Sequence, residues 1–195
     1  HFLLIDPYLS DSLTKKYEAT DKPHVRMTER VVDPARLDFI NVVTSSHNHT
    51  DHLDAETLLP LIAANPNLKL VIPEVNRAFV AERLHCDPAW PIGLDIGRST
   101  YVSGYRIEAV PAAHEQLSAE YVGYVIEAGR VRIYHAGDTV LYEGMADRLR
   151  PLKVDIALLP INGSSPERRV AGNLNGREAA QLAYDIGAKT AIPMH

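Results

Sequence analysis

The order of apolar and polar positions predicts short strands that alternate with helices. Residues 39–45 and 154–160 are apolar runs bounded by turn-forming residues, as expected of buried strands. Residues 121–127 and 131–134 are typical of two antiparallel strands joined by a turn at Gly129. The pattern therefore predicts an α/β chain. Further strand-like runs cover residues 2–5, 69–73 and 105–110.

Capping residues and apolar spacing predict three helices. The helix at 55–64 can begin after Asp54, whose carboxylate can accept hydrogen bonds from the first amides. A second helix is predicted at 74–84, and a third begins after Asn175, which forms a capping box with Glu178. The predicted apolar faces are Val75, Phe79 and Val80 in the second helix, and Ala179, Leu182, Ala183 and Ile186 in the third, which Gly187 ends.

A cluster of polar side chains follows the strand predicted at 39–45. It has the pattern His-x-His-x-Asp-His, at His47, His49, Asp51 and His52. Four such groups in six residues do not share one helix face or one strand face, so they suit a turn that points them at a common centre. Imidazole with carboxylate favours zinc, manganese or iron over calcium. The alternative is a histidine-rich surface loop, which the tight spacing and the patterned flanks disfavour.

Composition narrows the class of protein. The 195 residues, with 46% hydrophobic and 23% charged side chains, predict one globular domain over 1–195. The single cysteine, Cys86, rules out an intrachain disulfide and favours a cytoplasmic location. A net charge of −5 argues against a nucleic-acid partner, and no apolar run is long enough for a membrane span. We therefore expect a small-molecule substrate, and self-association stays open.

Three further polar residues each follow a strand-like run. His114 lies in Val-Pro-Ala-Ala-His-Glu, Asp138 in Tyr-His-Ala-Gly-Asp-Thr, and His195 in Ala-Ile-Pro-Met-His. An early aspartate, Asp6, lies in Leu-Leu-Ile-Asp-Pro. With these residues in this order, the chain resembles the metallo-β-lactamase superfamily over nearly its whole length.

The resemblance implies a fold and a metal centre. The fold would be that family's αββα four-layer sandwich. It would hold two divalent metal ions, zinc or manganese, and Asp51 would orient the attacking water. The first ion would be bound by His47, His49 and His114, the second by Asp51, His52 and His195, and Asp138 would bridge them. The resemblance gives His135 no ligand role, and we interpret it as a supporting or packing residue.

Departures from other branches narrow the activity. Metallo-β-lactamases usually have cysteine at the position of Asp138, and the redox diiron branch has glutamate at that of His49. The motifs look most like the branch of L-ascorbate-6-phosphate lactonase. That resemblance implies a dinuclear-metal-bound hydroxide attacking a lactone or ester of a small substrate, phosphorylated ones included. Two alternatives stay open: a phosphodiesterase of the N-acylphosphatidylethanolamine phospholipase D type, and a non-catalytic metal-binding module.

A long polar loop is the candidate for substrate binding. It lies between the strand at 154–160 and the helix capped by Asn175, and it is rich in glycine. A solvated surface loop is an equally good interpretation. The candidate substrate-binding residues are Asn162, Arg168, Arg169 and Asn173.

Both ends of the chain differ from the family pattern. The chain starts at His1, directly before a strand-like run, and stops at the proposed ligand His195. Members of the family normally open with a β-hairpin and continue past the last histidine. We therefore expect a domain that is truncated at both ends.

Overall fold

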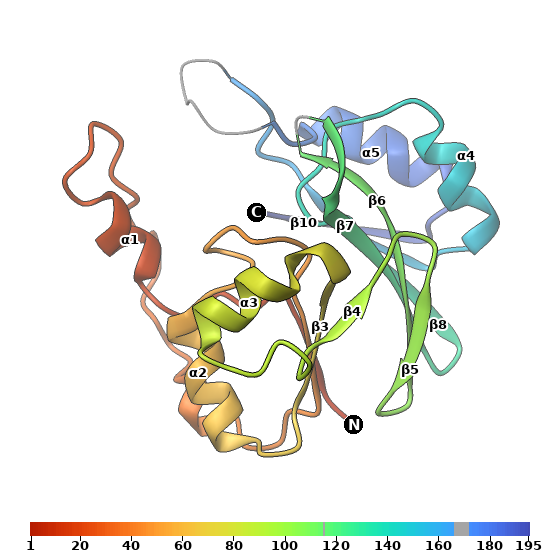
Figure 1. Ribbon diagram of the computed structural model, residues 1–195. Coiled ribbons are helices and arrows are strands. Elements are labelled where there is room, and N and C mark those ends of the chain that lie inside the picture. The colour runs from red at the N-terminus through yellow and green to blue at the C-terminus, as the bar shows by residue number, and fades with distance from the viewer. Residues whose placement is uncertain (115, 166–171) are drawn as a thin grey trace. The chain divides into compact units, whose positions relative to one another are not determined.

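The computed structural model describes residues 1–114, 116–165 and 172–195. It divides the chain into two compact units, His1–Gly93 and Leu94–His195. Each unit contains one sheet with its helices (Figure 1). The prediction of a single domain over 1–195 stays a prediction.

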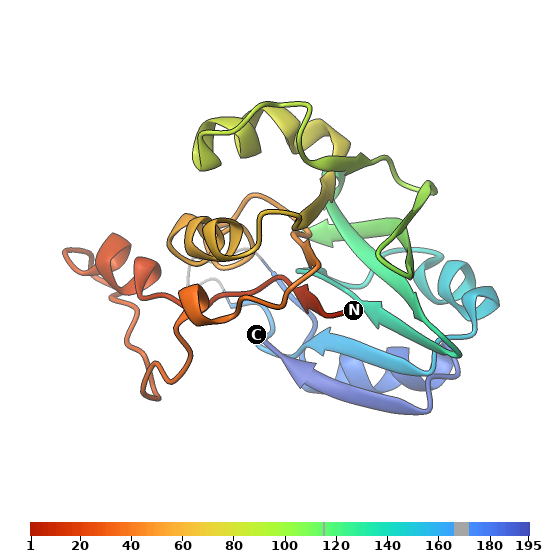
Figure 2. The ribbon, with the colours of Figure 1, turned by 90° about the horizontal axis from the view of Figure 1, so that it is seen from below.

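The first unit is built on a sheet of four strands in the order β1-β2-β3-β4. The neighbours β1, β2 and β3 are parallel, so their carboxyl ends lie at the same edge. Both ribbon views show α2 and α3 on the same side of these strands (Figures 1 and 2). The strands are β1 (Leu3–Ile5), β2 (Val42–Thr44), β3 (Lys69–Pro73) and β4 (Ile92–Leu94), and the helical segments are α1 (Ser12–Tyr17), η1 (Pro34–Arg36), α2 (Ala55–Ala64), η2 (Glu74–Asn76) and α3 (Arg77–Leu84).

Helix α2 forms at the predicted residues. The side chain of Asp54 accepts a hydrogen bond from the backbone N–H of Glu56, as its capping role requires. The helix buries Leu58 and Leu61 against Val43 of β2 in the core of this unit. Capping and burial therefore fix the start and the orientation of the helix that follows the histidine motif.

The strand predicted at 39–45 is shorter than expected. Only Val42–Thr44 is extended and paired, while Phe39 is 49% exposed. The reason is that Ile40 donates its backbone N–H to the side-chain oxygen of Asn65, at 2.9 Å, instead of to a neighbouring strand. The strand still ends directly before the histidine motif, as predicted.

The helix predicted at 74–84 is wrong in its first turn and in its buried face. Glu74–Asn76 is a 3-10 turn, and the α-helix begins at Arg77. Because a 3-10 turn has three residues instead of 3.6, it shifts the phase of the helix that follows. Two residues of the predicted apolar face are exposed, Val75 within the 3-10 turn and Phe79 in the helix that follows. The residues that α3 buries are Val80, Ala81 and Leu84.

The second unit is built on a sheet of six strands in the order β10-β9-β8-β7-β6-β5. Strands β8, β9 and β10 are parallel, and Figure 2 shows β9 and β10 side by side and pointing the same way. The three remaining neighbouring pairs, β5 with β6, β6 with β7 and β7 with β8, are antiparallel. The strands are β5 (Ser99–Val102), β6 (Tyr105–His114), β7 (Gln116–Ala128), β8 (Val131–His135), β9 (Ile156–Pro160) and β10 (Thr190–Met194), and the helical segments are α4 (Met145–Leu149), η3 (Arg150–Leu152) and α5 (Gly176–Asp185).

The capping box predicted for α5 is present. The Asn175 side chain accepts from the backbone N–H groups of Arg177 and Glu178, and Glu178 accepts from the backbone N–H of Asn175. The predicted apolar stripe is buried with β8 and β9 residues in one core. The stripe consists of Ala179, Leu182, Ala183 and Ile186.

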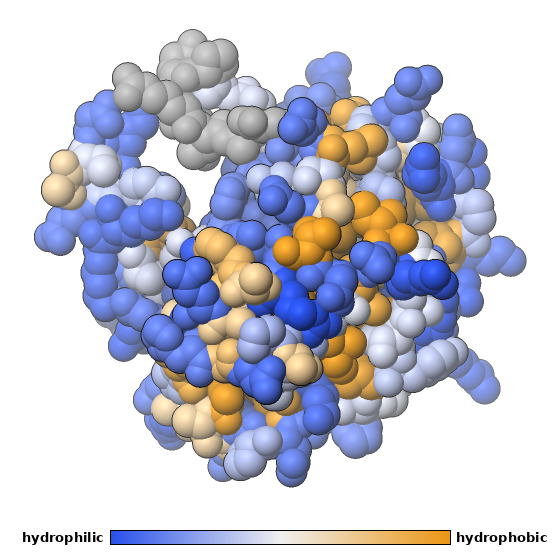
Figure 3. All heavy atoms as spheres, viewed as in Figure 1, coloured by the Kyte–Doolittle hydropathy of each residue, from blue (hydrophilic) through white to orange (hydrophobic). Residues whose placement is uncertain are grey.

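Helix α1 was not predicted, and among the described α-helices it differs from α2 to α5 in burying no residue. Figure 3 shows mainly hydrophilic side chains over it. Polar contacts hold it instead: Ser12 donates its hydroxyl to Asp54 at 2.8 Å, and Lys15 forms an ion pair with Glu56. None of the helices in the described ranges is long and apolar enough to cross a membrane.

Candidate metal centre

The turn after β2 gathers the four residues of the motif. The centre of the His47 ring lies 4.6 Å from that of His49 and 4.1 Å from that of His52. Nitrogen atoms of His47 and His49 lie within 4.8 Å of each other, and so do a carboxylate oxygen of Asp51 and a nitrogen of His52. The amides of His52 and Leu53 both donate to the His49 carbonyl, at 3.1 and 2.8 Å, which closes the turn. The motif thus offers two pairs of metal-binding atoms.

The early aspartate fixes the orientation of one of these histidines. Asp6 directly follows β1, and its Oδ2 lies 2.9 Å from Nδ1 of His52. The same oxygen accepts from the backbone N–H and the hydroxyl of Ser46, and Oδ1 accepts from the hydroxyl of Thr44. A carboxylate at Nδ1 favours the proton on that nitrogen, so the lone pair of the ring is on Nε2. Asp6 therefore favours the tautomer in which His52 would offer Nε2 to a metal ion.

The second unit gathers three more predicted ligands. His114 ends β6, Asp138 follows β8, and His195 follows β10. Oδ2 of Asp138 lies 3.7 Å from Nε2 of His114 and 3.1 Å from Nε2 of His195. The Asp138 side chain is 4% exposed. One buried carboxylate oxygen therefore lies close to both histidines.

A backbone carbonyl orients His114. Its Nδ1 lies 3.2 Å from the carbonyl oxygen of Gly172, which favours a proton on Nδ1 and leaves Nε2 to face Asp138. A Cβ at position 172 would meet Val140 at 2.9 Å and Ser164 at 3.1 Å. Glycine is therefore needed for the backbone to come this close. Reasoning from the sequence missed Gly172, whose only signal was a glycine in a candidate loop.

The segment after Asp138 is held by hydrogen bonds through Thr139. The Thr139 N–H donates to Oδ1 of Asn173 at 2.8 Å, and the Ala113 N–H donates to the Thr139 hydroxyl at 2.9 Å. Both bonds are buried. They tie Asp138 to the strand end that carries His114 and so keep the two ligands in register.

The predicted substrate-binding residues lie in different settings. Asn173 is 3% exposed, and its side-chain oxygen is engaged by Thr139. Asn162 is partly buried and forms a β-bridge with Asn175. Arg168 and Arg169 lie outside the described residues. Substrate binding by these four residues stays a prediction, and the structure adds a supporting role for Asn173.

His135 is separate from these groups. It is the last residue of β8 and is 3% exposed. Its carbonyl lies so near Gly123 of β7 that a Cβ there would meet it at 2.9 Å. In the part of the chain that the structure describes, His135 belongs to neither group of side chains that could hold a metal ion. The interpretation of His135 as a supporting or packing residue stays a prediction.

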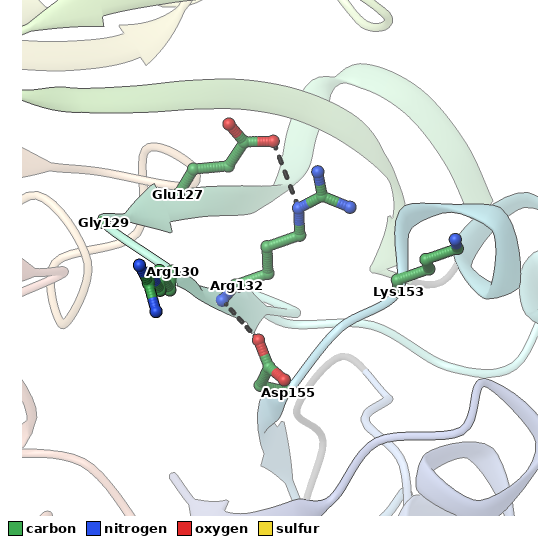
Figure 4. Close-up of a pocket in the computed structure, with 6 residues that line it drawn as sticks. All are labelled: Glu127, Gly129, Arg130, Arg132, Lys153 and Asp155. Carbon is green, nitrogen blue, oxygen red and sulfur yellow. Dashed lines mark hydrogen bonds and ion pairs between the residues drawn. The ribbon is translucent and has the colours of Figure 1, made fainter.

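A pocket of about 330 Å³ lies in the second unit, at the end of β8 away from Asp138 (Figure 4). Its charged groups are largely paired: Nε of Arg132 lies 3.2 Å from Glu127, and the Arg132 N–H donates to Asp155. None of the predicted metal ligands lines it. The lining residues are Glu127, Gly129, Arg130, Arg132, Lys153 and Asp155.

The chemistry of the predicted ligands fits a transition metal. Histidine nitrogens and aspartate oxygens are the donors that zinc and manganese accept in proteins, and two of the histidines have Nδ1 engaged by an acceptor. Within each of four pairs, the candidate ligand atoms lie within 4.8 Å of each other. The pairs are His47 with His49, Asp51 with His52, His114 with Asp138, and Asp138 with His195. The chain therefore carries a His/Asp cluster that could hold metal.

Comparisons with known proteins agree with this chemistry. Residues 1–195 match the family model of the beta-lactamase superfamily domain. A UPF0173 metal-dependent hydrolase of Pyrococcus furiosus is 32% identical over 99% of this chain and 76% of its own length. One from Caldivirga maquilingensis is 30% identical, over 99% and 73%. The structure of the metallo-beta-lactamase fold protein YhfI from Bacillus subtilis, 18% identical, matches with a TM-score of 0.66 over 99% of this chain and 73% of that one.

These matches confirm the predicted superfamily and fold class, an α/β chain with two sheets. They do not reach the lactonase branch, which stays a prediction. The chain therefore belongs to the metallo-β-lactamase superfamily of metal-dependent hydrolases.

Proposed function

We propose that this protein hydrolyses the lactone or ester bond of a small molecule, using two divalent ions, zinc or manganese. The observation that carries the proposal is the position of Asp138. One oxygen of this buried carboxylate lies 3.7 Å from His114 and 3.1 Å from His195, as a ligand shared by two ions would. The first ion would be held by His47, His49 and His114, the second by Asp51, His52 and His195, with Asp138 common to both.

When bound, two such ions lower the pKa of a water toward 7 and polarise the oxygen that is attacked. The protein supports this chemistry by fixing its ligands in advance. Asp6 and the Gly172 carbonyl hold the tautomers of His52 and His114, so neither ring must reorient on metal binding. Pre-set ligands reduce the entropy lost when the ions bind.

Asp51 is the residue proposed to handle protons. Its side chain is 27% exposed, whereas those of His52 and Asp138 are 8% and 4% exposed. A substrate can therefore approach Asp51 more easily than the other carboxylate of the centre. Oδ of Asp51 would orient the attacking water, take up its proton and deliver it to the leaving oxygen.

The substrate class is proposed from the sequence of the loop at 162–175. Arg168 and Arg169 would bind an anionic group away from the reacting carbonyl, as a phosphorylated lactone requires. Remote binding energy of this kind raises turnover as well as affinity. Replacing both arginines by alanine should lower kcat/KM for a phosphorylated lactone by roughly tenfold or more, and barely change hydrolysis of an uncharged lactone.

A substrate panel tests the proposed reaction. Protein loaded with zinc or manganese should hydrolyse lactones or esters, and Asp51→Asn should lower the rate while keeping the protein folded. A phosphodiester should be a poor substrate in the same assay. Hydrolysis of phosphodiesters with no turnover of any lactone or ester would overturn the proposal.

A further inference from the structure

Arg83 lies on the last turn of α3, where its guanidinium group is half-buried. The carbon atom of that group lies 4.4 Å from the centre of the Phe79 ring, one helical turn earlier. This cation–π contact holds the guanidinium beside the helix. Burial lowers the pKa of Arg83, and the Asp54 carboxylate opposes that shift. A cation kept in such a place needs acceptors that make up for its lost hydration.

Those acceptors are two backbone carbonyls of the turn after β2 that carries the proposed ligands at 47–52, called the metal-binding turn below. Nη1 of Arg83 donates to the carbonyl of Asn48 at 2.6 Å and to that of Leu53 at 3.1 Å. These two residues lie on either side of the segment 49–52, which holds three of the proposed ligands. One nitrogen atom therefore connects both ends of the turn.

Asn76, directly before α3, forms a second contact with the same turn. The Asn48 side chain donates to Oδ1 of Asn76, the residue that precedes α3, at 3.2 Å. Asn76 is 2% exposed. The turn is therefore contacted by Asn76, directly before α3, and by Arg83 in the last turn of α3. A turn held at both ends keeps a constant separation between the ligands that it carries.

We infer that Arg83 is a positioning residue for metal binding, which acts by fixing the distance between His49 and the pair Asp51 and His52. The inference rests on the proposed function, because it presumes that these side chains bind metal. In this proposal Arg83 acts through the backbone of the turn and is not itself a ligand. Its guanidinium replaces water at two loop carbonyls and so prevents the turn from opening when no ion is bound.

Arg77 provides a matched control. It lies on the first turn of the same helix, and its Nη1 also donates to two backbone carbonyls, those of Pro88 and Pro91. Those carbonyls belong to the segment after α3, which contains none of the proposed ligands. Arg77→Met and Arg83→Met each remove two bonds from an arginine of the same helix to backbone carbonyls, and only Arg83→Met affects the turn that carries the proposed ligands. Arg77→Met also removes the ion pair with Glu74, at 2.7 Å, so it is the more demanding control for loss of stability.

The test measures zinc affinity in metal-free protein by competition with a chromogenic chelator, after circular dichroism has shown that each variant is folded. Arg83→Met should bind zinc about 10- to 100-fold more weakly than wild type, the range expected for a partner that orients ligands. Arg77→Met should stay within about threefold of wild type. Arg83→Lys should lie between wild type and Arg83→Met, because an ammonium group restores part of the bonding.

A cobalt-loaded sample adds a spectroscopic readout, since a changed ligand geometry shifts the visible absorption of Co²⁺ in Arg83→Met and leaves it unchanged in Arg77→Met. If Arg83→Met does not fold, Arg83→Lys carries the test with the same comparison. Zinc affinities that are equal in the Arg83 and Arg77 variants would overturn the inference. Wild-type protein that binds no zinc would instead overturn the proposed function and the inference with it.

Discussion

Oδ2 of Asp6 lies 2.9 Å from Nδ1 of His52, although the two residues are 46 positions apart in the chain. The parallel pairing of β1 with β2 brings the two residues together, because Ile5 and Thr44 are partners, Asp6 directly follows β1, and the turn that carries His52 follows β2. The sheet therefore positions the orienting carboxylate and its histidine together.

The contact predicts the effect of Asp6→Asn. The amide keeps the shape of the carboxylate but removes the charge that favours a proton on Nδ1 of His52. Metal affinity should fall by about 10- to 100-fold, with a smaller effect on folding. Chelator competition on metal-free protein measures the change. An affinity equal to that of wild type would show that Asp6 does not set the state of His52.

Asp138 and His135 are close in sequence and should differ in function. Asp138→Ala removes the ligand proposed to be common to both ions, so both the metal content and hydrolysis should be largely lost. His135→Ala should keep most of its metal and much of its rate, although the cavity that it leaves will lower stability. Metal content and kcat, measured side by side, check this pair. Equal losses would show that the division between ligand and supporting residue is wrong.

The buried side chain of Tyr134 leads us to expect that Tyr134→Phe stabilises the protein. Its side chain is fully buried, and among the described residues its hydroxyl has no hydrogen-bond partner. Burial raises the pKa of this phenol well above its usual value, so the hydroxyl stays neutral and bears the cost of lost hydration. Tyr134→Phe should therefore raise the free energy of unfolding by about 1 kcal/mol.

Tyr142→Phe is the control for Tyr134→Phe. The Tyr142 hydroxyl donates to the carbonyl of Pro111 at 3.0 Å, so its removal should lower the free energy of unfolding by about 1 kcal/mol. Urea titrations of both variants give the two values. Destabilisation in both would mean that the Tyr134 hydroxyl makes a bond in solution.

The contacts of Asp155 lead us to expect that its contribution to stability falls at acidic pH. The ion pair with Lys189, at 2.6 Å, and then the backbone N–H of Arg132 hold the pKa of this carboxyl below its usual value. A carboxyl whose pKa is lowered by folding stabilises the protein above its unfolded pKa of about 3.9, and loses that effect as the pH falls through the folded value. The difference in free energy of unfolding between wild type and Asp155→Asn should shrink from about pH 5 to pH 2. A difference that stays constant across that range would contradict the assignment.

Local sequence signals were sufficient for part of the fold. The cap of α2 at Asp54 and the capping box of Asn175 with Glu178 depend on residues within one helical turn, and both were predicted at the right positions. Segments that depend on distant partners were not. Helix α1 buries no side chain, so it has no apolar period, and Phe39 is left out of β2 by a bond between Ile40 and Asn65.

The site shows the same division. The motif at 47–52 could be found because imidazole and carboxylate at this spacing have few other uses. Of the groups that orient the proposed ligands, Asp6 was found from the sequence and the others were not, because they act through the backbone. Arg83 donates to two backbone carbonyls, and His114 is oriented by the backbone carbonyl of Gly172. Because every residue has such a carbonyl, the sequence does not mark the ones that are used. Only the folded chain shows which carbonyls are used.

The number of metal ions bound tests the central claim most directly. Metal-free protein is reconstituted with zinc or manganese, passed through a desalting column and subjected to elemental analysis with an independent protein concentration. Seven ligand candidates, with Asp138 common to two sets, predict two equivalents of metal per chain in wild type. At most one equivalent, after reconstitution with either metal, would contradict the dinuclear centre.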